Sequence, residues 1–187
     1  TSLHPSWTLR TLSYHEAVPG HHLDGATSVD RDVPMLVKAL WSNTSGEGWA
    51  LYAERLASEM GMYADDPYSD LGRLQAELHR AVRLVVDTGM HAKKWSREQA
   101  IAYMVETEGL DEATSTSEIE RYVVWPGQAL GYKLGQLKIL ALREEAKQAL
   151  GDSFDIRDFN QQVLDAASAP LPYIEASTRH WIAASVN

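Results

Sequence analysis

Three histidines and one glutamate occur within eight residues near the start of this 187-residue chain, in the stretch Tyr14-His15-Glu16-Ala17-Val18-Pro19-Gly20-His21-His22. Imidazole and carboxylate groups are ligands for zinc, and a site with three protein ligands leaves one position open for water. In the pattern H-E-x-x-H, a spacing of four places both imidazoles on one helix face, with the glutamate beside the water. The stretch therefore indicates hydrolytic metal chemistry, although the residue four after His15 is a proline.

The proline decides how the histidines can meet. On an unbroken helix His22 would lie about 10.5 Å along the axis from His15, and His21 would point about 120° away around it. A proline inside a helix removes a hydrogen bond and clashes with the preceding turn, so residues 18–20 should kink or bulge the helix. A bulge that absorbs two residues would bring His21 to the place of the second histidine. We therefore expect His15 and His21 to be ligands on a kinked helix, with His22 as the weaker alternative.

Glu16 is the candidate general base, because it directly follows a proposed ligand and could take a proton from the water that the metal activates. The alternative is that residues 14–22 form only a polar junction between a helix and a loop. That alternative is weakened because three of the seven histidines of the chain lie in this stretch.

The rest of the chain has the apolar periodicity of helices, and no stretch alternates as a strand would. We predict an all-α fold that forms a single domain over residues 1–187. Start and stop signals, such as Asp66-Pro67 and Ser96 with Gln99, help to place the helices. The expected helical segments are 8–26, 46–61, 67–91, 96–109, a short one from 115, 126–150, one after 155, and a last one that follows Pro170-Leu171-Pro172 and runs through 181.

Three glycines, Gly127, Gly131 and Gly135, recur at a spacing of four within the segment 126–150. Each glycine inside a helix costs roughly 1 kcal/mol relative to alanine, so a bare stripe needs a reason. Close packing of a neighbouring helix is the favoured reason, and backbone lying near a substrate is the alternative.

The charge and composition of the chain limit which ligands and macromolecules it is expected to bind. The formal net charge of −9 and the pI of about 5.2 argue against nucleic acid or an anionic membrane surface. No apolar run of 18 residues and no signal peptide occur, so we expect no membrane contact from this segment. The absence of cysteine leaves histidine and carboxylate as the strong metal ligands.

Four segments, HEAVPGHHL, SGEGWALYAE, RLVVDTGMH and PGQALGYKLG, together resemble the family called domain of unknown function 885. The resemblance runs from about residue 13 to the C-terminus, with the segments in the same order. It implies a zincin-like helical bundle and a zinc metallopeptidase of the gluzincin type. The first motif is similar to the HExGH of thimet-oligopeptidase-like and angiotensin-converting-enzyme-like peptidases, widened by two residues. Members are usually several times longer, so we expect this chain to be the C-terminal, motif-bearing part. A missing N-terminal region of the same protein would then be its partner in forming the cleft.

The resemblance also implies further site residues. Gluzincins take their third ligand from a glutamate on the next helix, and Glu47 stands 26 residues after His21. Glu54 lies seven residues further along on a similar face, and could instead orient a ligand histidine. The alternative for either glutamate is a solvated helix face.

Tyr132 is implied as the hydroxyl that supports the oxyanion, a suitable role for a phenol; packing in a glycine-lined interface is an equally supported alternative. Arg121 and Tyr122 are expected to bind a substrate carboxylate or the oxyanion. His91 could support the site from outside the ligand set, or could simply favour the end of its helix.

The resulting hypothesis is a zinc-dependent hydrolase that binds zinc through His15, His21 and Glu47, and cleaves a peptide or small amide substrate. The alternatives are a non-catalytic helical interaction module, a catalytically incomplete fragment, and a hydrolase in which Glu16 and a histidine act without metal. The sequence does not indicate the compartment.

Overall fold

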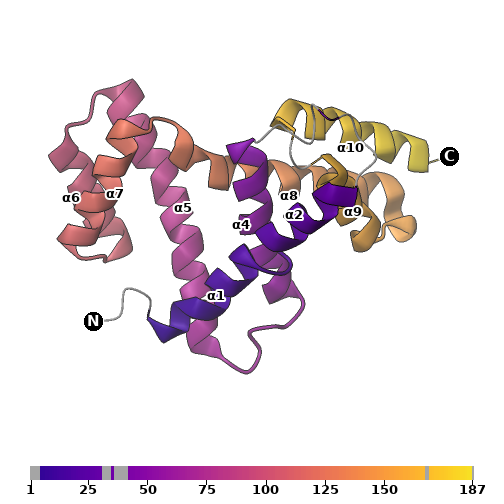
Figure 1. Ribbon diagram of the computed structural model, residues 1–187, viewed down its shortest axis with the longest axis horizontal. Helices are drawn as coiled ribbons and strands as arrows, with labels where there is room; N and C mark the ends of the chain where they lie inside the picture. Colours follow the sequence, from indigo (N-terminus) through magenta and orange to yellow (C-terminus); the bar gives the residue numbers. More distant parts are fainter. Residues whose placement is uncertain (1–4, 31–34, 36–41, 167–168, 187) are drawn as a thin grey trace.

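The computed structural model describes residues 5–30, 35, 42–166 and 169–186, and these residues form helices without any strand (Figure 1). The all-α prediction is therefore confirmed. The helices are α1 (Ser6–Glu16), α2 (His21–Asp30), α4 (Asn43–Glu59), α5 (Pro67–Lys93), α6 (Arg97–Glu108), α7 (Glu112–Val124), α8 (Gly131–Leu150), α9 (Ile156–Ala166) and α10 (Leu171–Ser185), with 3₁₀ turns at Gln128–Leu130 and Gly151–Ser153. Across the described part of the chain, no helix has the length and apolar character needed to cross a membrane.

The predicted capping signals fix two helices. The Asp66 carboxylate accepts a hydrogen bond from the Ser69 N–H at the start of α5. Ser96 and Gln99 form the complete capping box of α6, and the predicted stop residue Gly109 is its C-cap.

Three predicted helix starts were wrong. Helix α4 begins at Asn43 rather than at Gly46. Helix α7 begins at Glu112 rather than at Ser115, because the Asp111 carboxylate accepts from the Thr114 N–H and caps the helix earlier. Helix α8 begins at Gly131 rather than at Pro126, because Gly127 adopts a φ of +79° and a 3₁₀ turn follows it.

The α7–α8 connection is held by α5. The Gly127 N–H donates to the Asp87 carboxylate at 3.0 Å, and His91 Nε2–H donates to the Tyr122 carbonyl at 3.0 Å. The RLVVDTGMH segment thus binds the loop that leads into Tyr132.

Two hydrophobic clusters form the interior. The first lies among α4, α8, α9 and α10, and the second among α5, α6, α7 and the 3₁₀ turn before α8. Figure 1 shows α6 and α7 at one end of the molecule and α9 and α10 at the other, with α4 and α8 between them. Helix α1 packs on α5 and α4.

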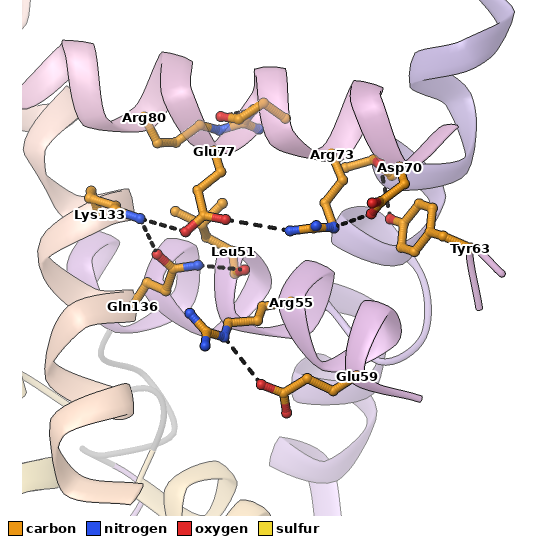
Figure 2. A network of polar contacts seen from close by, with 12 residues as sticks. Leu51, Arg55, Glu59, Tyr63, Asp70, Arg73, Glu77, Arg80, Lys133 and Gln136 are labelled. Atoms are coloured by element: carbon orange, nitrogen blue, oxygen red, sulfur yellow. Dashed lines mark hydrogen bonds and ion pairs between the residues drawn. The ribbon is translucent and has the colours of Figure 1, made fainter. Parts of the chain in front are cut away.

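A polar network joins α5, α4 and α8 (Figure 2). Lys133 Nζ on α8 donates to Glu77 on α5 at 2.7 Å and to Gln136 at 2.7 Å. The fully buried Gln136 donates in turn to the Leu51 carbonyl of α4 at 3.2 Å. These directional contacts fix the relative positions of α5 and of the two helices that carry the candidate site residues Glu47, Glu54 and Tyr132.

Two of the three spaced glycines allow α8 to approach α4 closely. A Cβ on Gly135 would collide with the Thr44 carbonyl oxygen and one on Gly131 with the Asn43 side chain, while one on Gly48 of α4 would lie 2.5 Å from the Gly135 Cα. Packing is therefore the reason for these two glycines, whereas Gly127 lies outside the helix.

We predict that Gly48→Ala lowers the free energy of unfolding by roughly 1–3 kcal/mol, because the added methyl meets backbone atoms that cannot rotate away. Gly25→Ala in α2 is the matched control: a Cβ added there would meet nothing within 4 Å, so stability should be unchanged or raised by up to roughly 1 kcal/mol. Urea unfolding of both variants measures the difference. Equal stability of the two variants would contradict the proposed close contact.

Candidate metal centre

The His-Glu motif spans two helices rather than one kinked helix. Helix α1 ends at Glu16 and α2 begins at His21. The Ala17 carbonyl accepts from the N–H groups of His22 at 3.1 Å and Leu23 at 3.4 Å, five and six residues later, instead of the usual four. The junction thus takes up two extra residues and brings His21 beside His15.

Close contacts hold this junction in place. A Cβ on Gly20 would collide with the carbonyl oxygens of Tyr14 and His15, so only glycine fits there. The Trp49 indole N–H of α4 donates to the Pro19 carbonyl at 2.9 Å. The turn is therefore anchored to the helix that carries Glu47.

The structure brings together the three predicted ligands. Glu47 Oε2 lies 3.4 Å from His15 Nε2 and 3.3 Å from His21 Nε2, and one ligand atom from each residue lies within 4.8 Å of the others. The two imidazole rings stand edge to face, 4.9 Å apart. His15 is buried, whereas His21 and Glu47 are partly buried and so border accessible space.

The donor set fits zinc in kind and in spacing. Two ligand atoms bound at about 2.1 Å to one tetrahedral zinc ion lie about 3.4 Å apart. Both measured separations between Glu47 and the histidines match this value. His15, His21 and Glu47 would therefore hold the ion, and leave a coordination position free.

Glu54 takes the role of orienting a histidine. The His15 Nδ1–H donates to Glu54 Oε1 at 2.7 Å, so in the neutral ring that a metal ion would bind, the lone pair is on Nε2, the atom that faces Glu47. Glu54 is only 2% exposed, which excludes the alternative of a solvated helix face.

The electrostatics of the cluster favour a positive charge between these groups. Burial alone would raise the pKa of Glu47, but hydrogen bonds from His15 and His21 outweigh it and lower the pKa to about 2. Burial alone would lower the pKa of His15, but its contacts with Glu47 and Glu54 raise it. The carboxylates on both sides of the His15 ring therefore attract a cation, either a proton or a metal ion.

Glu16 and His22 both lie outside the cluster. Both side chains are exposed, one at the end of α1 and the other in the first turn of α2. His22 supplies no atom to the ligand group of the described residues. Glu16 is exposed at the end of α1, and its role as general base stays a prediction.

Tyr132 lies next to the cluster. Its ring stacks on that of His15 with centroids 6.2 Å apart and an interplanar angle of 18°. The guanidinium of Arg83 lies 4.8 Å from the Tyr132 ring centroid, and that of Arg80 lies 5.7 Å away. The phenol is therefore held beside the predicted ligands, although its role toward an oxyanion is untested.

Arg121 and Tyr122 lie further from the cluster. Tyr122 is buried in the second hydrophobic cluster, where its hydroxyl donates to Glu118 at 2.5 Å and accepts from Arg83 Nε at 2.8 Å. Arg121 donates to the Gln128 side chain at 3.1 Å. Tyr122 thus contacts Arg83, which covers the Tyr132 ring, and substrate contact by Arg121 or Tyr122 stays a prediction.

Sequence reasoning missed the arginines of α5. Arg83 is 6% exposed and donates to Glu118 at 2.8 Å while it covers the Tyr132 ring. A sequence feature could have identified it, because Arg83 is the first residue of the RLVVDTGMH segment, which carries part of the family resemblance. Arg80 lies 3.8 Å from Glu54. No motif in the sequence indicated Arg80 as part of the site.

The fold and the site thus define an all-helical protein with a His/His/Glu cluster suited to a metal ion. The family described as "Bacterial protein of unknown function (DUF885)" matches residues 1–177, and the chain belongs to this family. The resemblance inferred from the four segments is confirmed to that extent. No curated protein matches the chain.

Solved structures similar to this chain include the following two. One is described as a "putative lipoprotein" from Colwellia psychrerythraea, with 55% identity, a TM-score of 0.92, and coverage of 96% of this chain and 31% of that chain. The other is a "putative lipoprotein of unknown function" from Shewanella oneidensis, with 30% identity, a TM-score of 0.85, and coverage of 91% and 31%. The chain spans about a third of the length of both relatives.

We predict that the purified chain binds about one zinc ion, and that His15→Ala, His21→Ala and Glu47→Ala each lose it, because each removes one of three ligands. His22→Ala is the matched control on the same motif, and should retain the metal. Elemental mass spectrometry after dialysis against zinc measures the content. Zinc that persists in the first three variants, or is lost in the control, would contradict the assignment of ligands.

Proposed function

We propose that this chain carries the centre of a zinc-dependent hydrolase that cleaves peptide or related amide bonds. The observation that carries the proposal is the His15–His21–Glu47 cluster, with Glu54 bound to the far nitrogen of His15. Structural zinc sites are closed by four protein ligands, whereas catalytic sites have three and keep a position open. The gluzincin-type ligand set and the zincin-like nature of the bundle form part of the same proposal.

A bound zinc ion would supply a Lewis acid and lower the pKa of a water molecule toward neutrality. Side chains of the protein would orient the ligands and transfer the proton. His15 is kept in one tautomer by Glu54, which orients its ring and increases its basicity. Glu16, exposed at the junction, would accept the proton of the attacking water and pass it to the leaving amine.

Tyr132 would stabilise the negative charge that develops on the carbonyl oxygen. A phenol donor held in advance is effective because little reorganisation is needed when the charge forms. Its ring is held by stacking on His15 and by the guanidinium of Arg83, which is fixed in turn by Tyr122 and Glu118. This arrangement supports a positioned rather than a mobile hydroxyl.

We predict that Glu16→Gln leaves the zinc content unchanged and lowers turnover of a mixed peptide library by about 10²- to 10⁴-fold, because it removes only the proton acceptor. Glu112→Gln, at an exposed position on α7, is the control and should be as active as the parent. Mass spectrometry of the products measures cleavage. Retained activity in Glu16→Gln would refute the role of Glu16. Activity that survives a strong chelator would instead favour acid–base chemistry without metal.

We predict that Glu54→Gln weakens zinc binding by about 10- to 100-fold, the usual effect of removing a charged partner from a ligand histidine. The amide oxygen can still accept from His15 Nδ1, so the ring should stay in place. Glu59→Gln, near the C-terminal end of the same helix and paired with Arg143, is the matched control. Competition with a chromophoric chelator gives the affinities; equal values for both variants would contradict the role of Glu54.

A further inference from the structure

The outer face of α5 carries a mostly apolar seam. Uncharged side chains recur there at alternating spacings of three and four residues, which is the a and d pattern of a coiled-coil heptad. They are Leu71, Leu74, Leu78, Ala81, Val85 and Thr88. At 1.5 Å per residue, the seam from Leu71 to Thr88 is about 25 Å long. A helix with such a seam is suited to pack along a second helix.

The four largest side chains of the seam are open to solvent. Leu71 is 56% exposed, Leu74 50%, Leu78 40% and Val85 37%. Within the described residues, neither hydrophobic cluster includes any of them. Single apolar residues are normal on a protein surface, whereas a contiguous row of them indicates an interaction site.

The opposite side of α5 already has its neighbours. Val82 and Val86 are buried in the second hydrophobic cluster, and the backbone at Gly72 lies against Trp7 of α1. The seam is therefore a second apolar face of the same helix, and it is not the face that holds α5 to the rest of this chain.

A solvated helix face elsewhere in this chain has a different composition. The exposed positions of α6 include charged and amide side chains, namely Arg97, Glu98, Gln99 and Glu106. No charged residue occupies any of the six seam positions of α5. This difference within one chain indicates that the seam is suited to contact with protein rather than with water.

A second copy of this chain does not suit the seam. Partner choice between paired helices is set largely by the charges that flank such a seam. Here the flanking carboxylates are already paired within the chain, Asp70 with Arg73 at 2.7 Å and Glu77 with Lys133 at 2.7 Å. The net charge of −9 on each chain would add repulsion between two copies.

The relatives have another candidate occupant. This chain covers only 31% of each solved relative, although the similar region has the same fold, with TM-scores of 0.92 and 0.85. About two-thirds of each relative thus lies outside the similar region. A helix there has an apolar stripe that must be buried against another element, and the seam of α5 is such an element.

We propose that the seam of α5 is the docking face for an amphipathic helix from the part of the family's polypeptide that lies outside the region similar to this chain. The helix would run along α5 at a crossing angle of about 20°, the geometry of heptad packing. Because α5 also carries Arg83, whose guanidinium covers the Tyr132 ring, the docked helix would support the element that positions the phenol. The inference goes beyond the proposed hydrolase, and does not depend on a bound metal.

Thiol labelling tests this docking on whole proteins. The chain has no cysteine, so Leu78→Cys gives a single thiol on the seam, and Ala102→Cys gives a matched thiol on the exposed face of α6. Both should react readily with iodoacetamide in this chain. In the full-length relative from Colwellia psychrerythraea, a cysteine at the position aligned with Leu78 should react at least about tenfold more slowly, because a covered thiol reacts only when the helices open locally. A cysteine aligned with Ala102 should react at an unchanged rate, and mass spectrometry of the labelled peptides gives each rate.

The proposal is overturned if the Leu78 position reacts equally fast in both proteins, or if it is protected no more than the Ala102 position. Analytical ultracentrifugation of this chain tests the other occupant. A dimer that Leu74→Glu dissociates would assign the seam to a second copy and overturn the proposal, whereas a monomer supports it. Should circular dichroism show that Leu78→Cys alters the fold, Leu74→Cys replaces it on the same seam. Neither measurement uses zinc or substrate, so failure here leaves the hydrolase proposal untouched.

Discussion

The approach of α4 to α8 at Gly48 and Gly135 is the constraint on which the candidate site depends. The two backbones are so close that a single methyl group between them would meet main-chain atoms. Glu47 precedes Gly48 by one residue, and Tyr132 precedes Gly135 by three, so the same contact places a carboxylate and a phenol beside His15. A wider separation of the helices would move these side chains apart.

A second constraint comes from the junction of α1 and α2. Proline and glycine break the helix, and the Ala17 carbonyl accepts hydrogen bonds from residues five and six positions later. The histidines that no regular helix could bring together then lie with their rings 4.9 Å apart. Because Trp49 of α4 binds the turn between them, this geometry is a property of the folded state rather than of the local sequence alone.

Much of the site was predictable from sequence because its signals are local. The absorption of two residues between His15 and His21 follows from helical spacing and the chemistry of proline, and Glu47 followed from a family spacing. Helix caps at Asp66 and Ser96 are similarly local and were found. The form of the break between α1 and α2 could not be predicted. Whether it is a kink or a full turn depends on how Trp49 binds Pro19.

What the sequence could not supply was the set of contacts between distant segments. Arg83 and Glu118 are 35 residues apart and meet only because α5 and α7 pack together. Tyr122, expected to face a substrate, is buried by the same packing. The start of α8 was misplaced because Asp87, 40 residues earlier, binds the Gly127 N–H. Periodicity in a single sequence contains no information on such pairings.

The buried carboxylate of Glu54 lies between groups of two other helices: its Oε1 accepts from His15 of α1 at 2.7 Å and lies 3.8 Å from Arg80 of α5. One negative charge is thus shared by an imidazole and a guanidinium. Because burial makes an uncompensated charge costly, loss of this one carboxylate would disturb α5 as well as the histidine.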